Sequence, residues 1–485
     1  MMFLKIFGEI VMTLNSFYFI FFFLIVVMLY FIIPIKMRKS WLLLTSYIFC
    51  LTYNSDSLIA LIYSTIVSYL FGIILNRLHA CRRKAGEIIC LWGGIFFCIL
   101  PWMMERVSQY SLFVLVGTSF YVLQEIAYLI DIYRGKSSAE KNPINYALFI
   151  AFFPKLVSGP IERSDNLLRQ MNNEHNVIFD YNRVKEGFLL IIWGYFEKSV
   201  IADSLSFCVN SIYGDWESYS GAALVLATVV FAFQLYADFA GYTNIAIGAA
   251  QVLGFGLQDN FRQPYLACNI KDFWRRWHIS LSIWLRDYIY IPLGGNRKGI
   301  IRQYVNLMIT FLISGLWHGA GWNFLAWGLL HGAFHVIEKC WHNVKKKLEV
   351  VADLPNRSIM LDIVRRISVF VLVDIAWIFF RASGLKSAIG ILNKCFFEIS
   401  IDNFARDIFF SLNLSVGEIF VGILLIMLLF ATDILRERNI RISAFLARKP
   451  AVLRWFCYIM ILLILTIVEM RRCGIAASNF IYMQF

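Results

Sequence analysis

The chain is poor in charge and lacks the sequence motifs of the common soluble enzymes. Only 16% of its 485 residues are charged, against about 25% in a typical soluble domain. It has no GxSxG nucleophile elbow, no Walker loop and no dinucleotide-binding glycine loop. Its ten cysteines form no CxxC pair and no zinc-ligand spacing, so no metal site is expected. These absences argue against a serine hydrolase, a nucleotide-binding enzyme and a zinc protein.

Apolar residues are what the chain has in abundance. Hydrophobic residues make up 59% of it, 44 residues are phenylalanine, and the mean hydropathy is +0.66. We therefore predict an all-α polytopic membrane protein that forms a single domain over residues 1–485. The net charge of +13 comes from basic residues between the apolar runs, where the positive-inside rule places them. Membrane lipids are thus expected contacts, and nucleic acid is not.

The apolar runs are separated by short polar loops. They fall at residues 17–35, 41–53, 57–76, 88–104, 112–132, 145–157, 187–201, 219–237, 241–257, 303–317, 322–338, 364–380, 415–435 and 451–468. Several are shorter than the roughly 20 residues of a full span. We predict about eleven transmembrane helices plus re-entrant or interfacial fragments.

Basic loops give an orientation for most of the chain. Lysine and arginine follow the first, third and fifth runs, which places the N-terminus outside the cytosol. The basic loop 436–449 should be cytosolic, so the tail 473–485 should lie outside. Arg471 and Arg472 argue weakly against this. Residues 145–260 cannot be oriented by counting charges.

The segment 270–293 is too polar to span a bilayer and too aromatic for an ordinary loop. A continuous helix would place four of its residues on one face by the i, i+3, i+4, i+7 spacing. They are Trp274, Trp277, His278 and Leu281. One interpretation is an interfacial amphipathic helix. The other is a re-entrant element whose arginines face a phosphate-bearing ligand. These arginines are Arg275, Arg276 and Arg286.

Two histidines, His278 and His318, each follow a tryptophan in stretches that otherwise suit membrane depth. A titratable ring is costly to desolvate there, so by default it marks a functional site. Three glycines around His318 permit a tight turn or a close backbone approach. They are Gly315, Gly319 and Gly321. His318 could instead be a core histidine that caps a helix end.

Paired imidazoles in a membrane cavity suit acyl transfer. A neutral imidazole can take the proton of a hydroxyl group as that group attacks an activated acyl carbon, without a metal. His318 and His278 are therefore candidate catalytic residues. His331 and His335, one helical turn apart, are expected to be packed or to lie at headgroup level instead.

Further motifs accompany the two Trp-His blocks. They lie at residues 119–135, 152–161, 236–242 and 377–381. Together these motifs resemble the membrane-bound O-acyltransferase (MBOAT) family. The similarity covers nearly the whole chain and is greatest to the bacterial branch of alginate and peptidoglycan O-acetylation membrane proteins. It implies a helical bundle around a central tunnel that joins a cytosolic and an outer funnel.

The resemblance also implies functional residues. His318 matches the invariant histidine of the family, and His278 matches its second active-site position. Candidates for lining the tunnel are Trp277, Trp317, Asn323 and Asp238. The implied acyl donor is acetyl-CoA, with no bound cofactor, and we infer that the arginines of 270–286 attract its phosphates. The implied location is the bacterial inner membrane, and the implied partner is an extracytoplasmic SGNH-type O-acetyltransferase.

The C-terminal residues 480–485 fit the FxYxxF ending that this group of proteins and its small partner peptides share. An uncharged aromatic tail can be a simple interfacial anchor. Alternatively, the Tyr482 hydroxyl is a transient acyl acceptor, which requires an outward tail.

Two other functions stay open from the residues alone. A transporter or flippase for lipid-linked sugars could use the mid-span acids Asp238 and Asp374, although no internal repeat supports it. A structural scaffold for a cell-wall complex is the third hypothesis. The residues do not name the acceptor polysaccharide.

Overall fold

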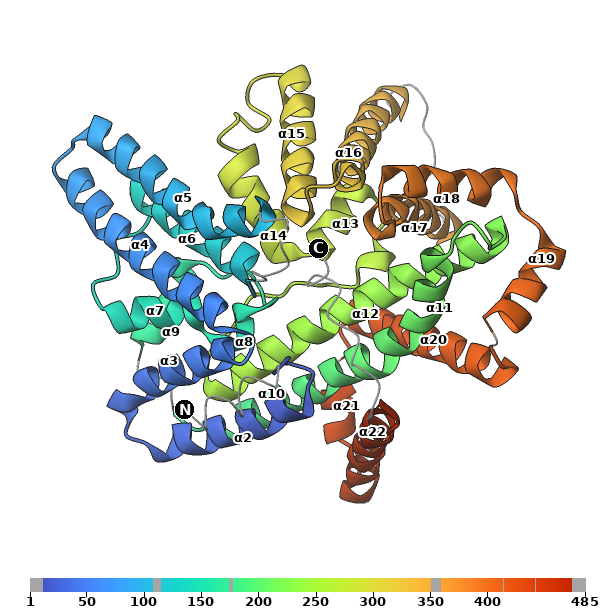
Figure 1. The fold of residues 1–485 in the computed structure, drawn as a ribbon, viewed down its shortest axis with the longest axis horizontal. Coiled ribbons are helices and arrows are strands. Elements are labelled where there is room, and N and C mark those ends of the chain that lie inside the picture. The colour runs from blue at the N-terminus through green and yellow to red at the C-terminus, as the bar shows by residue number, and fades with distance from the viewer. Residues whose placement is uncertain are drawn as a thin grey trace. The chain divides into compact units, whose positions relative to one another are not determined.

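The computed structural model describes residues 12–107, 115–173, 178–349, 359–412, 414–440 and 442–472. Every regular element in these ranges is helical, so the all-α prediction is confirmed (Figure 1). The chain divides into two compact units. Unit 1 comprises Met1–Tyr195 with Gly241–Asp259, and unit 2 comprises Phe196–Ala240 with Asn260–Phe485. A single domain over residues 1–485 stays a prediction.

Unit 1 is built from the N-terminal helices. In chain order they are α2 (Phe17–Ile32), α3 (Ile35–Leu51), α4 (Ser55–Ala80), α5 (Lys84–Val107), α6 (Thr118–Tyr133), α7 (Pro143–Ala151), α8 (Phe153–Leu156), η1 (Ser164–Leu168), α9 (Arg169–Asn172) and α10 (Tyr181–Tyr195). The predicted run 145–157 is broken at Phe152 because Pro154 cannot continue α7. Its ring would clash with the carbonyl group of Ile150. The buried Lys155 amine donates to that carbonyl, 3.2 Å away.

Glycines bring two long helices of unit 1 into close contact. Helix α12 (Gly221–Leu253) enters unit 1 with its last turns, from Gly241 onward. A Cβ atom at Gly194 of α10 would lie 2.6 Å from the carbonyl oxygen of Gly241, and one at Gly248 would lie 2.6 Å from that of Gly187. The two glycines of each helix are seven residues apart, so one face of α10 packs directly on one face of α12.

Unit 2 contains the first part of α12, the two helices that precede α12 and all the helices that follow it. Besides α12, its helices are η3 (Phe196–Ala202), α11 (Asp203–Gly214), η4 (Pro264–Leu266), α13 (Ile270–Arg276), α14 (Ile279–Leu285), η5 (Arg286–Tyr290), α15 (Ile300–His318), α16 (Trp322–Glu349), α17 (Ile359–Arg381), α18 (Leu385–Phe397), α19 (Ile401–Arg406), η6 (Asp407–Ser411), α20 (Val416–Glu437), α21 (Ile442–Ala447) and α22 (Ala451–Arg472). The predicted runs 219–237 and 241–257 are one helix, α12.

Within the described ranges, six helices are long and apolar enough to cross a membrane. They are Ser55–Ala80, Lys84–Arg106, Gly221–Leu253, Ile300–His318, Val416–Glu437 and Ala451–Val468. This confirms a polytopic membrane protein. The larger figure of about eleven spans stays a prediction, because long helices such as α16 and α17 carry more polar residues. The predicted outer positions of the two ends fall on residues 1–11 and 473–485, outside the described ranges.

Candidate active site

The segment 270–293 is not one continuous helix, and the prediction of a single shared face was wrong. Helix α13 ends at Arg276, Trp277 is extended, and His278 has φ of 43° and ψ of 55° before α14 begins. This left-handed conformation is uncommon outside glycine, although histidine is among the residues enriched there. The break separates Trp274 and Trp277 from Leu281. Positive φ angles at Gly294 and Gly295 mark a turn after η5.

Asn260 fixes the chain at this break. Its backbone oxygen accepts from the N–H of Ile279 at 2.9 Å, and its side-chain oxygen accepts from the N–H and the hydroxyl group of Ser280 at 3.2 and 2.7 Å. The same Oδ1 atom lies 3.3 Å from Nδ1 of His278. Because an amide oxygen only accepts, Nδ1 must be the donor. Nε2 of a neutral His278 is therefore the basic nitrogen.

Burial keeps His278 uncharged. Its side chain is 1% exposed, and burial lowers its pKa from 6.5 to about 3. It lies between short helices of seven residues each, packed edge-on against the ring of Phe239 at a centroid distance of 4.8 Å. At physiological pH this imidazole is therefore neutral, and Asn260 holds it in one tautomer.

His318 is the last residue of α15, and the turn to α16 follows at once. As the glycines predicted, the two helices approach closely: a Cβ atom at Gly315 would lie 2.4 Å from the carbonyl oxygen of Phe324. The imidazole of His318 is 5% exposed. It packs edge-on against Trp327 and Phe380, at centroid distances of 5.0 and 5.2 Å.

The structure brings the two predicted imidazoles together around one indole. The ring of Trp317 lies 6.0 Å from that of His278 and 4.8 Å from that of His318. His318 also contacts Trp327, and the ring of Trp327 in turn lies 4.9 Å from that of His331. We call these five residues the imidazole–indole cluster. Residues 40 positions apart in the chain thus share one aromatic site within unit 2.

His331 is packed, as predicted. It is fully buried among aromatic rings that include Trp274 and Phe273, with centroid distances of 5.0 and 6.3 Å. Neither ring nitrogen has a hydrogen-bond partner among the described residues. Like His278, it therefore places a polar ring among aromatic ones.

Asp238, a candidate for lining the tunnel, belongs to a buried ion triad, and its place in a tunnel stays a prediction. The Lys198 amine lies 2.8 Å from a carboxylate oxygen of Asp203 and also contacts Asp238. All three residues are less than a tenth exposed. The next residue on α12, Phe239, contacts His278, so two consecutive positions of this helix face the ion triad and the imidazole–indole cluster.

Two other tunnel candidates have defined contacts. The Asn323 amide donates to the backbone oxygens of Phe379 and Ala382, both at 3.2 Å, and so joins the start of α16 to the end of α17. Trp277 packs against Phe261 and Trp377, each with its ring centroid 5.0 Å away. These contacts account for both residues as parts of the packing, and a role in a tunnel stays a prediction.

The three candidate donor-binding arginines differ in their surroundings. Arg276 forms a bidentate ion pair with Glu437 at 2.8 and 3.0 Å and contacts Asp272 at 3.0 Å. Arg286 is exposed and contacts the adjacent Asp287. Arg275 is exposed and has no ion pair in the described ranges. Arg275 and Arg286 are thus more available to a ligand than Arg276.

Sequence reasoning missed Asn260 and Lys198. Asn260 lies in a short loop without a motif, and its role appears only when the break at His278 brings it close. Lys198 lies inside the apolar run 187–201, where a lone lysine at membrane depth was the available signal. Tyr482, the candidate acyl acceptor, lies outside the described residues.

The class of the protein follows from its matched region. Residues 136–380, which contain both Trp-His blocks, match the model of the MBOAT, membrane-bound O-acyltransferase family. The protein is an integral membrane acyltransferase, and the match gives no support to a transporter or a scaffold.

Curated relatives agree with this class. A "Probable alginate O-acetylase AlgI" of Pseudomonas fluorescens is 36% identical over 364 residues, covering 74% of this chain and 70% of the relative. A "Peptidoglycan O-acetyltransferase" of Helicobacter pylori is 32% identical over 394 residues, covering 73% of each chain. A "Teichoic acid D-alanyltransferase" of Bacillus subtilis is 25% identical over 307 residues, covering 59% and 76%. The chain therefore belongs to the membrane-bound O-acyltransferase family.

Proposed function

We propose that the protein takes an acetyl group from acetyl-CoA in the cytosol and passes it across the bacterial inner membrane for O-acetylation of an extracytoplasmic polysaccharide. The names of the relatives support both the group and the acceptor class, because two of them name the O-acetylation of alginate and of peptidoglycan. No bound cofactor is needed, since the thioester is already activated.

The observation that carries the catalytic proposal is the shared contact of His278 and His318 with Trp317. Two costly buried imidazoles at breaks in two separate helices meet at one place in unit 2. Packing alone does not require histidine at either position, because apolar rings would fill the same space without the desolvation penalty. A shared chemical task explains both residues.

In the proposed step, His318 is the general base. The acceptor hydroxyl oxygen forms a bond to the thioester carbonyl carbon, and the carbon–sulfur bond breaks. The imidazole takes the hydroxyl proton and delivers it to the leaving sulfur, so coenzyme A departs as a free thiol and an ester remains. His278, held by Asn260 with Nε2 as its basic nitrogen, orients the donor or assists in this proton transfer.

Exposed positive charge supports the donor side of this proposal, and the predicted topology supports the acceptor side. Arg275 and Arg286 are exposed and suit the phosphates of acetyl-CoA. Trp317, which contacts both imidazoles, is the tunnel candidate with the strongest support. The outer tail would hand the acetyl group to an SGNH-type O-acetyltransferase, which transfers it to the polymer.

Replacing His318 tests the proposal. Purified protein with labelled acetyl-CoA should consume the thioester, and His318→Ala should lower this rate by roughly 100-fold or more, the usual contribution of a general base. His278→Ala should cost a smaller factor, and His79→Ala should match the wild type because His79 is an exposed residue of α4. An active His318→Ala protein with an unchanged melting temperature would refute the assignment.

Replacing Tyr482 tests the route out of the membrane. Tyr482→Phe removes only the hydroxyl oxygen, so labelled acetyl groups should no longer accumulate on the tail, as mass spectrometry of the C-terminal peptide can show. Tyr458→Phe, on the exposed helix α22, is the control. Unchanged polysaccharide acetylation in the Tyr482→Phe strain would eliminate the tail as the acceptor.

A further inference from the structure

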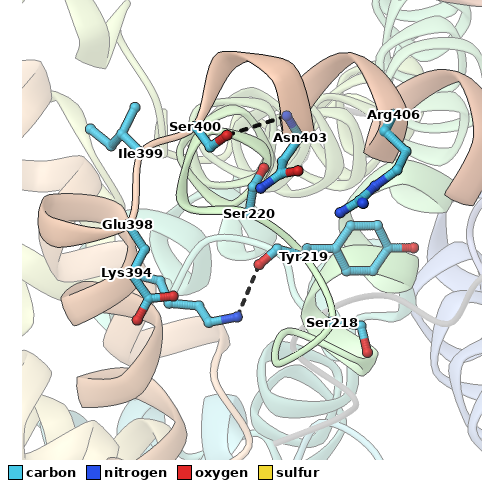
Figure 2. A pocket seen from close by; sticks show the side chains of 9 residues that line it. All are labelled: Ser218, Tyr219, Ser220, Lys394, Glu398, Ile399, Ser400, Asn403 and Arg406. Atoms are coloured by element: carbon cyan, nitrogen blue, oxygen red, sulfur yellow. Dashed lines mark hydrogen bonds between the residues drawn. The ribbon is translucent and has the colours of Figure 1, made fainter.

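A polar pocket lies in unit 2, where the loop between α11 and α12 meets α18 and α19 (Figure 2). Its volume is about 370 Å³. Ile399 is its one aliphatic lining residue; the others carry hydroxyl, amide or charged groups, and Tyr219 also presents a phenol ring. The pocket shares no lining residue with the imidazole–indole cluster.

The walls of this pocket are fixed by the backbone. The Lys394 amine donates to the carbonyl oxygens of Glu217 and Tyr219, at 2.5 and 3.1 Å. The buried carboxylate of Asp407 accepts from the N–H of Ser220 at 2.8 Å. A Cβ atom at Gly221 would lie 2.0 Å from the Lys394 carbonyl oxygen, so only glycine allows the loop and α18 to come this close. The site is therefore pre-formed, which lowers the entropic cost of binding.

Arg406 supplies an uncommitted positive charge. Its side chain is exposed and makes no ion pair or hydrogen bond with the described residues, and in Figure 2 it extends toward the ring of Tyr219. Lys394 is occupied by backbone carbonyls, and Glu398 is the single acid of the lining. An available guanidinium group beside hydroxyl and amide groups matches a ligand with one carboxylate and several hydroxyl groups.

The position of the pocket fits an extracytoplasmic ligand. Basic residues precede α17, at Lys345–Lys347, and follow α20, in the loop 436–449. We take α17 as one of the predicted spans. The positive-inside rule then places both of these ends in the cytosol and the intervening segment 382–415 outside. The loop 215–220 contacts that segment and shares its side, which also orients α12 with its N-terminal end outward.

We propose that this pocket binds a carboxylate-bearing sugar unit of the acceptor polysaccharide, with Arg406 pairing with the carboxylate group and Asn403 and Tyr219 binding hydroxyl groups. The proposal rests on the proposed function for the identity of the acceptor. A protein partner is less suited to the site, because protein interfaces are anchored by buried apolar or aromatic residues and this lining has a single aliphatic side chain.

Direct binding to the full-length protein in lipid nanodiscs tests the assignment without any acyl donor. The probes are an oligomer of mannuronic acid and a neutral malto-oligosaccharide of equal length, measured by titration calorimetry. The wild type should bind the uronate more tightly, and added salt should weaken that binding. Arg406→Gln should weaken it roughly tenfold to a hundredfold, the loss expected for a charged hydrogen bond. Arg406→Lys should have an intermediate affinity.

Controls separate this proposal from the catalytic one. Lys386→Gln removes a positive charge from an exposed position of α18 outside the pocket and should bind like the wild type. His318→Ala should keep its uronate affinity while it loses acetyl transfer. Equal uronate affinity in Arg406→Gln and the wild type would overturn the proposal, as would equal affinity for both oligosaccharides. Capture of a protein partner that depends on Arg406, with no sugar binding, would also overturn it.

Discussion

Two polar centres of unit 2 face consecutive residues of α12 and are built on opposite principles. The imidazole–indole cluster consists of three histidine and two tryptophan rings, with no lysine, arginine or carboxylate among its members. The ion triad of Lys198, Asp203 and Asp238 buries three ionisable groups and pairs them directly. Phe239 contacts the first centre and Asp238 belongs to the second.

The difference between paired charges and neutral imidazoles distinguishes a centre that stabilises the fold from one that takes part in chemistry. A buried charge must be paired, because an isolated one costs several kcal/mol, so each member of the triad is needed by the others. A neutral imidazole pays a smaller desolvation cost than a charged group and needs no counter-charge. Mutations in the triad should therefore lower stability, whereas mutations of His278 or His318 in the cluster should lower activity in a folded protein.

Lys198→Met should have the largest effect on stability. It leaves two buried carboxylates without a counter-charge and should lower the free energy of unfolding by about 3–5 kcal/mol. Thermal unfolding of the detergent-solubilised protein measures the change. A triple variant, with Asp203→Asn and Asp238→Asn added, should recover much of the loss because no charge remains. If Lys198→Met had normal stability but no transfer activity, the triad would take part in the reaction, and the contrast between a stabilising triad and a catalytic cluster would be wrong.

Asn260→Ala should have a smaller effect than Lys198→Met, and it should lower activity and not stability. It removes the acceptor that fixes His278, and we expect the transfer rate to fall by roughly tenfold, the value of one oriented hydrogen bond to a reacting group. Asn296→Ala, in an exposed turn, serves as the control.

A double-mutant cycle distinguishes positioning from a general structural role of Asn260. If Asn260 acts through His278, the double variant with His278→Ala should be no slower than His278→Ala alone. Additive losses would mean that Asn260 supports the fold independently of His278, and the claim that Asn260 positions His278 would be wrong.

The sequence predicts the helical architecture well and the site in part. Long apolar runs located most helices, and the glycines near His318 correctly predicted a close backbone approach at Gly315. Periodicity could not reveal the break at His278, because helical spacing continues through the segment and nothing in a histidine requires a positive φ. The partner of Asp238 was also beyond sequence reasoning, since Lys198 lies 40 residues away and only the packing of η3 against α12 brings them together.

The continuity of α12 has a consequence for how the protein can be divided. Its hydrogen-bonded ladder runs without interruption through Ala240 and Gly241, where one compact unit gives way to the other. A chain cut there would expose four amide groups and four carbonyl groups at the severed ends. In a bilayer each of these would cost several kcal/mol, since lipid offers no replacement partner. Fragment expression or a domain swap with its junction at this point of α12 should therefore yield insoluble protein.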